Sequence, residues 1–476
     1  MKTITRFFAL LILIWIYACK PEGFTTNFGD KLSFSEDTIV YDTILTKLYV
    51  GTPKSVNRQF VVRNPHSKRI KTSIFLAGGD QSQFRINVDG DPGTTFTDVE
   101  IGANDSIFVF VEAYANPNHN PSGNPLIVRD SIVFQTNGNF QNIQLVAWGQ
   151  DCNYIYRDST ETNVVWSDKT KPYVVYDYFY VKPGTTLTIK EGVKVYFSPY
   201  ATIYTEGTLK VEGTASEPVL FEGDRTSDKY SDKFSAYKYA NLPGQWFGLS
   251  FAWPTKGNSI NNARIKNAIF GIYCDSSSVD GQPIVDISKT FIQNMTFSAI
   301  RGTRSKIKAV NSVMANCGSV CVYTFKGGDY NLNFCTLSGF CDFGGTNDPA
   351  LVVSNRLRND FGQIIETYPI TFSMINTIVW GEQKEEVYLD IEAQKLIQLT
   401  PLNNLLKSNN ANFLVAGTNN VLNKNPKFKD YLKYRYDLDT LSPARGIGLT
   451  GTGITDDYLS KARDAAPDAG AFEKIE

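Results

Sequence analysis

Short segments in which apolar and polar residues alternate occupy residues 36–150 of this 476-residue chain. Residues 84–88 (FRINV) and 106–111 (SIFVFV) are examples, and turn residues such as Gly78-Gly79 separate such segments. A period of two indicates strands that bury one face, and evenly spaced short strands are typical of a β-sandwich. We therefore expect a β-sandwich over residues 36–150.

An internal repeat fills residues 151–476. Similar four-residue frames place their second residues at 267, 289, 311, 334 and 376, so the intervals are 22, 22, 23 and 42 residues. We interpret the last interval as about two periods with an insertion. Repeats of this length predict a solenoid, and β-branched and aromatic residues with Gly and Asn at the corners favour a β-solenoid. Its exposed end strands need cover, which we expect from the sandwich at one end and from the C-terminal residues at the other.

The first twenty residues have the layout of a secretory signal. Basic residues precede an unbroken apolar run over residues 7–16, which is too short to span a bilayer. Ala18-Cys19 then resembles the lipobox of bacterial lipoproteins, in which the cysteine becomes the new N-terminus and carries lipid. The resemblance implies a signal peptide over residues 1–18, lipidation of Cys19, and a tether over residues 19–35. An ordinary signal peptide with an unrelated cysteine is the alternative.

Motifs of the first block resemble bacterial immunoglobulin-like domains of the Hydin type. They are Val61-Val62-Arg63-Asn64, Phe84-Arg85-Ile86, and the segments 102–107 (GANDSI), 130–137 (DSIVFQTN) and 143–149 (IQLVAWG). The resemblance implies an immunoglobulin-like sandwich over residues 36–150. Such modules mostly serve as spacers or docking domains, so this resemblance indicates little about function.

Segments of the second block resemble right-handed parallel β-helix proteins of the pectin-lyase-like type. They are residues 183–197 (PGTTLTIKEGVKVYF) and 244–251 (GQWFGLSF), and the closing segments 425–428 and 468–473 resemble the ends of bacterial surface β-helix proteins. The implied fold class is all-β, an immunoglobulin-like β-sandwich followed by a right-handed parallel β-helix solenoid with a C-terminal cap over residues 151–476. Together with the lipobox, this resembles an outer-membrane lipoprotein of Bacteroidota-type bacteria, lipid-anchored and exposed at the cell surface or facing the periplasm.

The composition narrows the function classes. The 47 basic and 48 acidic residues nearly cancel and form no basic stripe, which argues against nucleic-acid binding. Two histidines leave little for catalysis or metal binding, so we expect no cofactor and no metal. The cysteines form no Cys-x-x-Cys motif, and a zinc site is not expected.

Six cysteines remain beyond Cys19, and two of them occupy similar places in successive coils. Cys317 lies six residues after frame position 311, and Cys341 lies seven after position 334. Stacking of the coils would bring them within disulfide range, so Cys317–Cys341 is a candidate disulfide. The alternative is a ladder of small buried side chains.

A catalytic site is not expected, although β-helix proteins include polysaccharide lyases and hydrolases. Arg264-Ile265-Lys266 matches a motif of the polygalacturonase-like hydrolases, but no histidine follows His119 to supply its partner motif. We interpret Arg264 and Lys266 as outward residues around an inward Ile265. Asp456-Asp457 is either a calcium site or a solvated loop, and residues 385–392 form an acidic, half-exposed strand.

Aromatic residues provide candidate binding surfaces. Tyr230, Phe234, Tyr237 and Tyr239 lie in a long polar insertion over residues 223–243, and loops that leave a rigid solenoid are frequent binding sites. Tyr176, Tyr178 and Tyr180 share one face of a predicted strand, as a binding surface or as a packed junction.

These features favour a non-enzymatic surface lipoprotein, attached to the membrane by its lipid, that acts as a rigid scaffold and docks to an outer-membrane β-barrel or other envelope protein. A glycan-binding or adhesin-like protein linked to polysaccharide uptake is the alternative. A polysaccharide lyase or hydrolase is the least favoured, for lack of an acid/base set.

Overall fold

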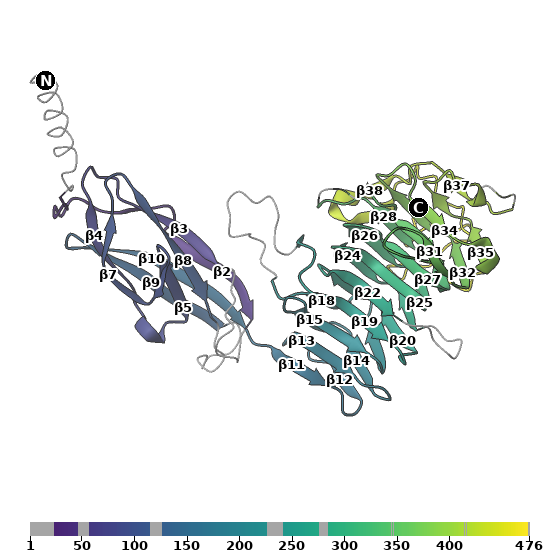
Figure 1. The fold of residues 1–476 in the computed structure, drawn as a ribbon, viewed down its shortest axis with the longest axis horizontal. Helices are drawn as coiled ribbons and strands as arrows, with labels where there is room; N and C mark the ends of the chain where they lie inside the picture. The colour runs from purple at the N-terminus through teal and green to yellow at the C-terminus, as the bar shows by residue number, and fades with distance from the viewer. Residues whose placement is uncertain are drawn as a thin grey trace, which may run out of the picture. The chain divides into compact units, whose positions relative to one another are not determined.

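The computed structural model describes residues 23–45, 57–114, 126–225, 241–275 and 284–474, except residues 344, 346, 414 and 416. They fall into two compact units that divide between Asp151 and Cys152 (Figure 1). Both units consist of β-strands with a few 3-10 turns, which confirms the all-β fold class. None of the described segments is a helix of the length and apolarity that crossing a membrane requires.

The N-terminal unit is a sandwich of two five-stranded sheets, in the orders β1-β3-β8-β5-β6 and β2-β10-β9-β4-β7. Alternate residues of both sheets point inward and form one core, as in β5, where Phe84, Ile86 and Val88 are buried. All pairings are antiparallel except that between β10 and β2. Its elements are β1 (Ser33–Phe34), β2 (Thr38–Leu45), β3 (Arg58–Arg63), β4 (Ile70–Leu76), η1 (Gly79–Gln81), β5 (Phe84–Val88), β6 (Asp91–Gly93), β7 (Thr95–Ile101), β8 (Ser106–Ala113), β9 (Leu126–Thr136) and β10 (Asn139–Gln150).

The sandwich begins earlier than the expected tether allows. Phe24 forms a bridge with Arg69, Leu32 is buried in the core, and Phe34 pairs with Val62. The described part of residues 19–35 is therefore packed on the sandwich. The Gly, Asn and Thr residues that indicated a tether form turns instead, held by short-range bonds such as that from the backbone N–H of Gly29 to Asn27 Oδ1 (3.0 Å).

The second unit is a parallel β-helix. Twenty-five strands form one continuous parallel sheet that winds around a single core, and each strand pairs with its counterpart one coil later (Figure 1). The strands are β11 (Asn153–Ser159), β12 (Val164–Trp166), β13 (Tyr173–Val181), β14 (Thr186–Lys190), β15 (Lys194–Phe197), β16 (Thr202–Thr205), β17 (Thr208–Glu212), β18 (Val219–Gly223), β19 (Gly248–Ala252), β20 (Asn258–Asn261), β21 (Ala263–Lys266), β22 (Phe270–Asp275), β23 (Val285–Ser288), β24 (Phe291–Met295), β25 (Ser298–Val310), β26 (Val313–Cys317), β27 (Val322–Asn333), β28 (Thr336–Gly339), β29 (Leu351–Ser354), β32 (Ile370–Ile375), β33 (Ile378–Gly381), β34 (Val387–Asp390), β35 (Leu396–Leu402), β36 (Leu405–Leu406) and β37 (Val421–Leu422).

The coils present three faces, two of which carry the surfaces discussed below. Face A contains β16, β19, β22, the first half of β25, the first half of β27, β29 and β34. Face B contains β14, β17, β20, β23, the second halves of β25 and β27, β32 and β35. Face C contains β15, β18, β21, β24, β26, β28, β33 and β36. Smaller elements are the hairpin β30 (Arg356–Arg358) and β31 (Ile364–Thr367), the pair β38 (Phe428–Asp430) and β39 (Arg435–Leu438), and the turns η4 (Ala393–Lys395), η5 (Ala411–Phe413) and η6 (Tyr431–Lys433).

The repeat frames mark corners of the coils. Lys289, Asn311, Phe334 and Asn376 all have positive φ, between 44° and 53°, and all lie between face B and face C. Asn267 also has positive φ but lies at the following corner, after β21, so its assignment to the same series was wrong. The short amide side chain of Asn tolerates this left-handed conformation, which explains why Asn marks the period.

The interval from 334 to 376 is one coil and not two. Asn333 pairs directly with Ile375, so the extra residues form an enlarged turn that contains the hairpin β30–β31. A period count along the chain cannot distinguish a second coil from a long insertion, because both add the same number of residues.

The C-terminal segment (residues 426–474) covers a side of the solenoid and not its end. It lies on the outer surface of face C, where Tyr436 and Phe472 pack on Phe291 and Val313. Successive B–C corners hold it in place. Lys289 pairs with Asp456 (2.6 Å), the ring of Phe334 lies under the Arg463 guanidinium (3.7 Å), and amides of further corners donate to its carbonyls, namely Asn311 to Asp456, Asn376 to Leu449 and Asn403 to Ile447.

Candidate functional site: a basic groove on face C

Two outward rows of side chains on face C change from charged to apolar residues along the solenoid. The first row runs through Lys194, Leu220, Arg264 and Phe291 to Val313, each residue in register with the next. The second runs through Glu222, Lys266 and Gln293 to Ala315. The C-terminal segment covers the apolar part of both rows, because that part would otherwise expose hydrophobic surface. The charged part is left open.

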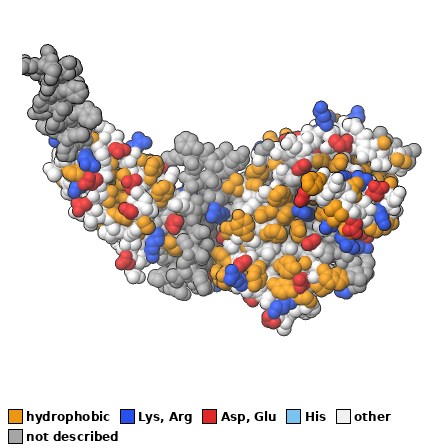
Figure 2. All heavy atoms as spheres, in the orientation of Figure 1, with side chains coloured by type: hydrophobic (Ala, Val, Ile, Leu, Met, Phe, Trp, Pro, Cys, Tyr) orange, Lys and Arg blue, Asp and Glu red, His pale blue; other side chains and the backbone are white. Residues whose placement is uncertain are grey.

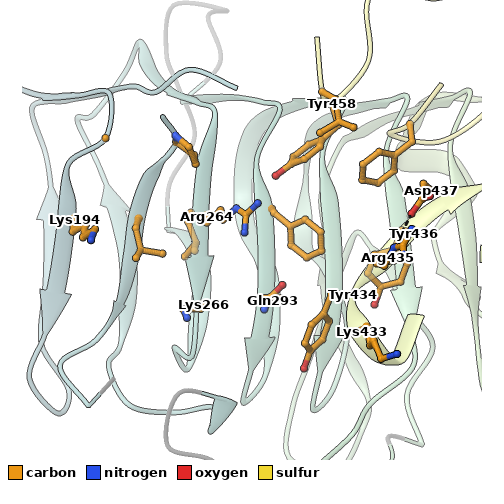
Figure 3. Close-up of a pocket in the computed structure, with 17 residues that line it drawn as sticks. Lys194, Arg264, Lys266, Gln293, Lys433, Tyr434, Arg435, Tyr436, Asp437 and Tyr458 are labelled. Atoms are coloured by element: carbon orange, nitrogen blue, oxygen red, sulfur yellow. Dashed lines mark ion pairs between the residues drawn. The ribbon is translucent and has the colours of Figure 1, made fainter. Parts of the chain in front are cut away.

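A groove of about 690 Å³ lies where the cover ends (Figure 3). Its floor is formed by the outward side chains of β15, β18, β21 and β24, and its wall by the C-terminal segment. The lining residues are Gly192, Lys194, Pro218, Leu220, Arg264, Ile265, Lys266, Phe291, Gln293, Lys433, Tyr434, Arg435, Tyr436, Asp437, Tyr458, Leu459 and Phe472.

Positive charge dominates this groove. Arg435 lies 3.7 Å from Asp437, and Lys266 forms an ion pair with Glu222 at the foot of the groove. Glu222 is buried, and burial raises the pKa of its carboxyl group while Lys266 opposes the rise. Lys194 and Arg264 are exposed and form no ion pair with a carboxylate of the described residues, although Lys194 lies near enough to Glu222 to lower its pKa and Arg264 forms a hydrogen bond with the Tyr458 hydroxyl. The groove therefore offers an anionic ligand two cations that have no ion-pair partner.

Aromatic rings form much of the wall. Tyr458 stands over the floor near Arg264 (Figure 3), and burial raises the pKa of its hydroxyl while the Arg264 guanidinium opposes the rise. Tyr434 is held by a hydrogen bond from Asn316 Nδ2 (3.0 Å), and burial raises its pKa to about 12. Both hydroxyls therefore stay protonated at neutral pH, and that of Tyr434 already donates a hydrogen bond to Asp342 Oδ2 (3.3 Å).

Arg264-Ile265-Lys266 has the orientation predicted from the sequence. Ile265 lies in the core, whereas Arg264 points outward and Lys266 is half-buried. What the sequence did not indicate is the contribution of Tyr434, Tyr436 and Tyr458. The available signal was the change from charged to apolar outward positions between β21 and β26, which marks the part of face C that needs a cover.

Several candidate residues lie outside the described residues. Cys19, the lipidation candidate, precedes the first described residue, and the binding candidates Tyr230, Phe234, Tyr237 and Tyr239 fall within residues 226–240. Their roles remain predictions.

The tyrosines of β13 do not share one face. A positive φ at Asp177 (70°) turns the strand, so that Tyr176 follows the part that pairs with β15, and Tyr178 and Tyr180 belong to the part that pairs with β16. The alternation expected over three tyrosines therefore breaks after Tyr176, whose ring packs on Tyr154 at 4.8 Å.

The candidate disulfide is absent, since Cys317 and Cys341 are both free thiols. Ala315 pairs with Ser338, and continuing this register places Phe340, not Cys341, beside Cys317. The thiol group of Cys317 instead forms a hydrogen bond with that of Cys321. This bond, together with burial, raises the pKa of Cys321. The ladder of small buried side chains describes these cysteines better.

Asp456 and Asp457 form neither a calcium site nor a solvated loop. Asp457 is fully buried and its carboxylate accepts the backbone N–H groups of Leu459 (2.8 Å), Lys461 (2.8 Å) and Glu473 (3.0 Å). Asp456 pairs with Lys289. No cluster of His, Cys, Asp or Glu suited to a metal ion occurs in the parts of the chain that the structure describes.

Comparison with known proteins supports the fold of this unit. The family model of a pectate-lyase-like β-helix domain matches residues 158–234, within the region that carries the first coils. No curated protein matches the chain.

Solved structures resemble the chain only distantly. The YadV chaperone is 9% identical over 25% of this chain and 51% of its own, with a TM-score of 0.17. A family 123 glycoside hydrolase from Clostridium perfringens is 10% identical over 27% and 30%, with a TM-score of 0.17. The catalytic domain of a GH87 alpha-1,3-glucanase is 10% identical over 77% and 79%, with a TM-score of 0.16. The chain thus spans about half of the chaperone and less than a third of the family 123 enzyme, and likeness at this level implies no activity.

Proposed function

We propose that this protein is a non-catalytic glycan-binding protein of the bacterial envelope, and that its basic groove binds a saccharide carrying negatively charged groups. The observation that carries the proposal is the pair of cations without an ion-pair partner, Lys194 and Arg264, in one row of an aromatic-walled groove. Hydrogen bonds from such cations to carboxylate or sulfate are stronger than neutral ones.

The geometry suits a repeating anionic ligand. Lys194 and Arg264 are separated by one coil, that of Leu220, so their backbones lie about 9.6 Å apart, two strand spacings. This distance is comparable to the length of a disaccharide unit. Two acidic sugars separated by one residue along a linear chain would therefore meet the two cations. Tyr434 and Tyr458 supply aromatic surface, and Tyr458 adds a hydroxyl group, a combination that sugar-binding sites use because pyranose rings have both apolar and hydroxyl faces.

Titration with oligosaccharides that do or do not carry negative charge tests the proposal. Oligogalacturonates, their methyl esters and sulfated galactan oligosaccharides would be titrated against the full chain in mild detergent. We expect the acidic forms to bind and the esters to bind weakly or not at all. Replacing both cations (Lys194→Ala with Arg264→Ala) should lower affinity at least about tenfold.

The matched control is Lys210→Ala, which removes an exposed cation from face B. Equal loss of affinity in control and groove variants would contradict the proposal, and so would equal binding of acids and esters. If shorter oligosaccharides appear during the incubation, the protein cleaves its ligand and the proposal of a non-catalytic role is wrong. Docking to an envelope protein, the role that the sequence favoured first, is better assigned to a different surface, because the open part of this groove is charged.

A further inference from the structure

Face A carries a row of side chains, four of them large, that is separate from the groove. Tyr204, Ser250, Tyr273, Arg301 and Tyr323 occupy this row on five successive coils, each in register with the next. Figure 2 shows that hydrophobic side chains reach the surface of the β-helix unit in continuous groups and not singly.

Three phenylalanines extend this row at the corner before face A. The rings of Phe270 and Phe297 are stacked (centroids 5.5 Å apart, 17°), and Phe247 packs edge-on against Phe270 (5.7 Å). Phe297 is 52% exposed. A large apolar ring at the surface of a soluble unit costs solvation free energy, and contiguous groups of such rings mark interaction sites.

Arg301 stands in the middle of these rings without a carboxylate. Its guanidinium lies 5.6 Å from the ring centroids of Phe270 and Tyr273 and 5.8 Å from that of Tyr323. Its Nε is buried and has no hydrogen-bond partner, and no Asp or Glu of the described ranges forms an ion pair with it. Cation–π contacts compensate only part of the lost hydration of a guanidinium.

We propose that the Arg301 patch (Phe247, Phe270, Tyr273, Phe297, Arg301 and Tyr323) docks a protein partner that places an Asp or Glu carboxylate against the Arg301 guanidinium. The charge complementarity is specific, because a planar guanidinium binds a carboxylate through two parallel hydrogen bonds. Arginine surrounded by tyrosine and phenylalanine is also the composition that dominates binding free energy in protein interfaces. This surface is independent of the proposed groove function.

The packing of the rings favours a protein over a glycan here. Sugars stack on free aromatic faces, but the ring of Phe270 is already stacked on Phe297 and lies under the Arg301 guanidinium. Phe247 and Tyr273 meet at 66°, so these two rings do not form one flat platform. Aromatic edges carry partial positive charge, which adds to that of Arg301 and favours an acidic side chain flanked by apolar ones.

Photo-crosslinking in cells tests the proposal on the full chain. Phe297 would be replaced by p-benzoylphenylalanine, in the wild-type background and in backgrounds with Arg301→Gln or Lys308→Ala. Lys308 lies on the same strand, exposed on face B, and serves as the matched control. We expect one discrete, protease-sensitive adduct whose yield falls at least tenfold with Arg301→Gln and is unchanged with Lys308→Ala.

A second measurement covers the case in which Arg301→Gln destabilises the fold, which thermal unfolding would reveal. Mass spectrometry of the wild-type adduct should place the crosslink in a partner peptide that contains Asp or Glu. An adduct that persists in the Arg301→Gln background of a folded protein overturns the proposal. So does a protease-resistant, periodate-sensitive adduct, which would assign the patch to a glycan, an adduct to a second copy of this chain, or a crosslinked peptide without an acidic residue.

Discussion

Arg463 holds the C-terminal segment on face C, and its removal should release that segment. The side chain is 2% exposed and pairs with Glu473, itself 1% exposed, at 3.0 Å. It also donates to the carbonyl oxygens of Asp456 (3.0 Å) and Gly470 (3.1 Å) and to Asn311 Oδ1 (2.9 Å). Arg463→Met keeps most of the apolar stem and removes every one of these hydrogen bonds.

The expected loss of stability follows from the buried carboxylate that the substitution leaves without a partner. Glu473 would remain buried without its cation, and breaking a buried ion pair in this way costs about 3–5 kcal/mol. Burial already raises the pKa of Glu473, so protonation limits the cost at acidic pH. A double variant with Glu473→Gln should therefore recover part of the loss, because the uncompensated charge is then absent.

Hydrogen exchange of residues 426–474 is the suitable assay, because the segment can open locally without unfolding the solenoid. A loss of about 3–5 kcal/mol predicts exchange that is faster by a factor between roughly 100 and several thousand. Lys429→Met is the matched control on the same segment. Lys429 is half-exposed and 3.1 Å from Asp437, and surface pairs of this kind contribute at most about 1 kcal/mol. Exchange in Arg463→Met within tenfold of wild type, or no recovery by Glu473→Gln, would refute the reasoning.

Two further predictions concern one buried carboxyl group and the lipid anchor. Glu386 is fully buried and accepts the backbone N–H groups of Ala350 (2.8 Å) and Gln383 (2.7 Å), and burial raises its pKa to about 7 from 4.5. Because the folded pKa is the higher one, the stability that this group contributes is present below about pH 4.5 and is lost as the pH rises through about 7, by about 3 kcal/mol. The free energies of unfolding of the wild type and Glu386→Gln would be compared between pH 4 and pH 8. Between these pH values the stability of the variant relative to the wild type should rise by about this amount, and a difference independent of pH would contradict the assignment. We also propose that Cys19 is lipidated and anchors the protein to the outer membrane: Cys19→Ser should abolish incorporation of labelled palmitate and move the protein to the soluble fraction, and unchanged membrane association would exclude the anchor.

The strands of the solenoid and the direction of their side chains could be predicted from local sequence. Ile265 points inward between outward Arg264 and Lys266, as alternation requires, and four of the five repeat positions lie at the same series of corners. These features depend on residues within a few positions of one another. The exceptions have local causes too, because Asp177 turns a strand that alternation treats as straight.

Burial of polar groups was less predictable. The acidic stretch at residues 385–392 was expected to be half-exposed, yet Glu386 is fully buried. Its carboxylate occupies space left by Gly339 and Gly381, where a Cβ atom would lie 2.5 Å and 2.3 Å from its oxygens. These glycines belong to neighbouring coils, so no pattern around Glu386 itself indicates its burial.

The sequence by itself therefore determined the β-sandwich, the winding of the β-helix and the outward direction of Arg264 and Lys266, because alternation and corner residues are encoded locally. Only the tertiary structure decided that the C-terminal segment lies along face C, that its tyrosines complete the groove, and that Arg301 stands among rings without a carboxylate. Each of these depends on contacts between coils or between segments more than a hundred residues apart, such as Lys289 with Asp456. Such contacts form between two surfaces that exist only once the coils and the C-terminal segment have folded, so a pattern along the sequence does not reveal them.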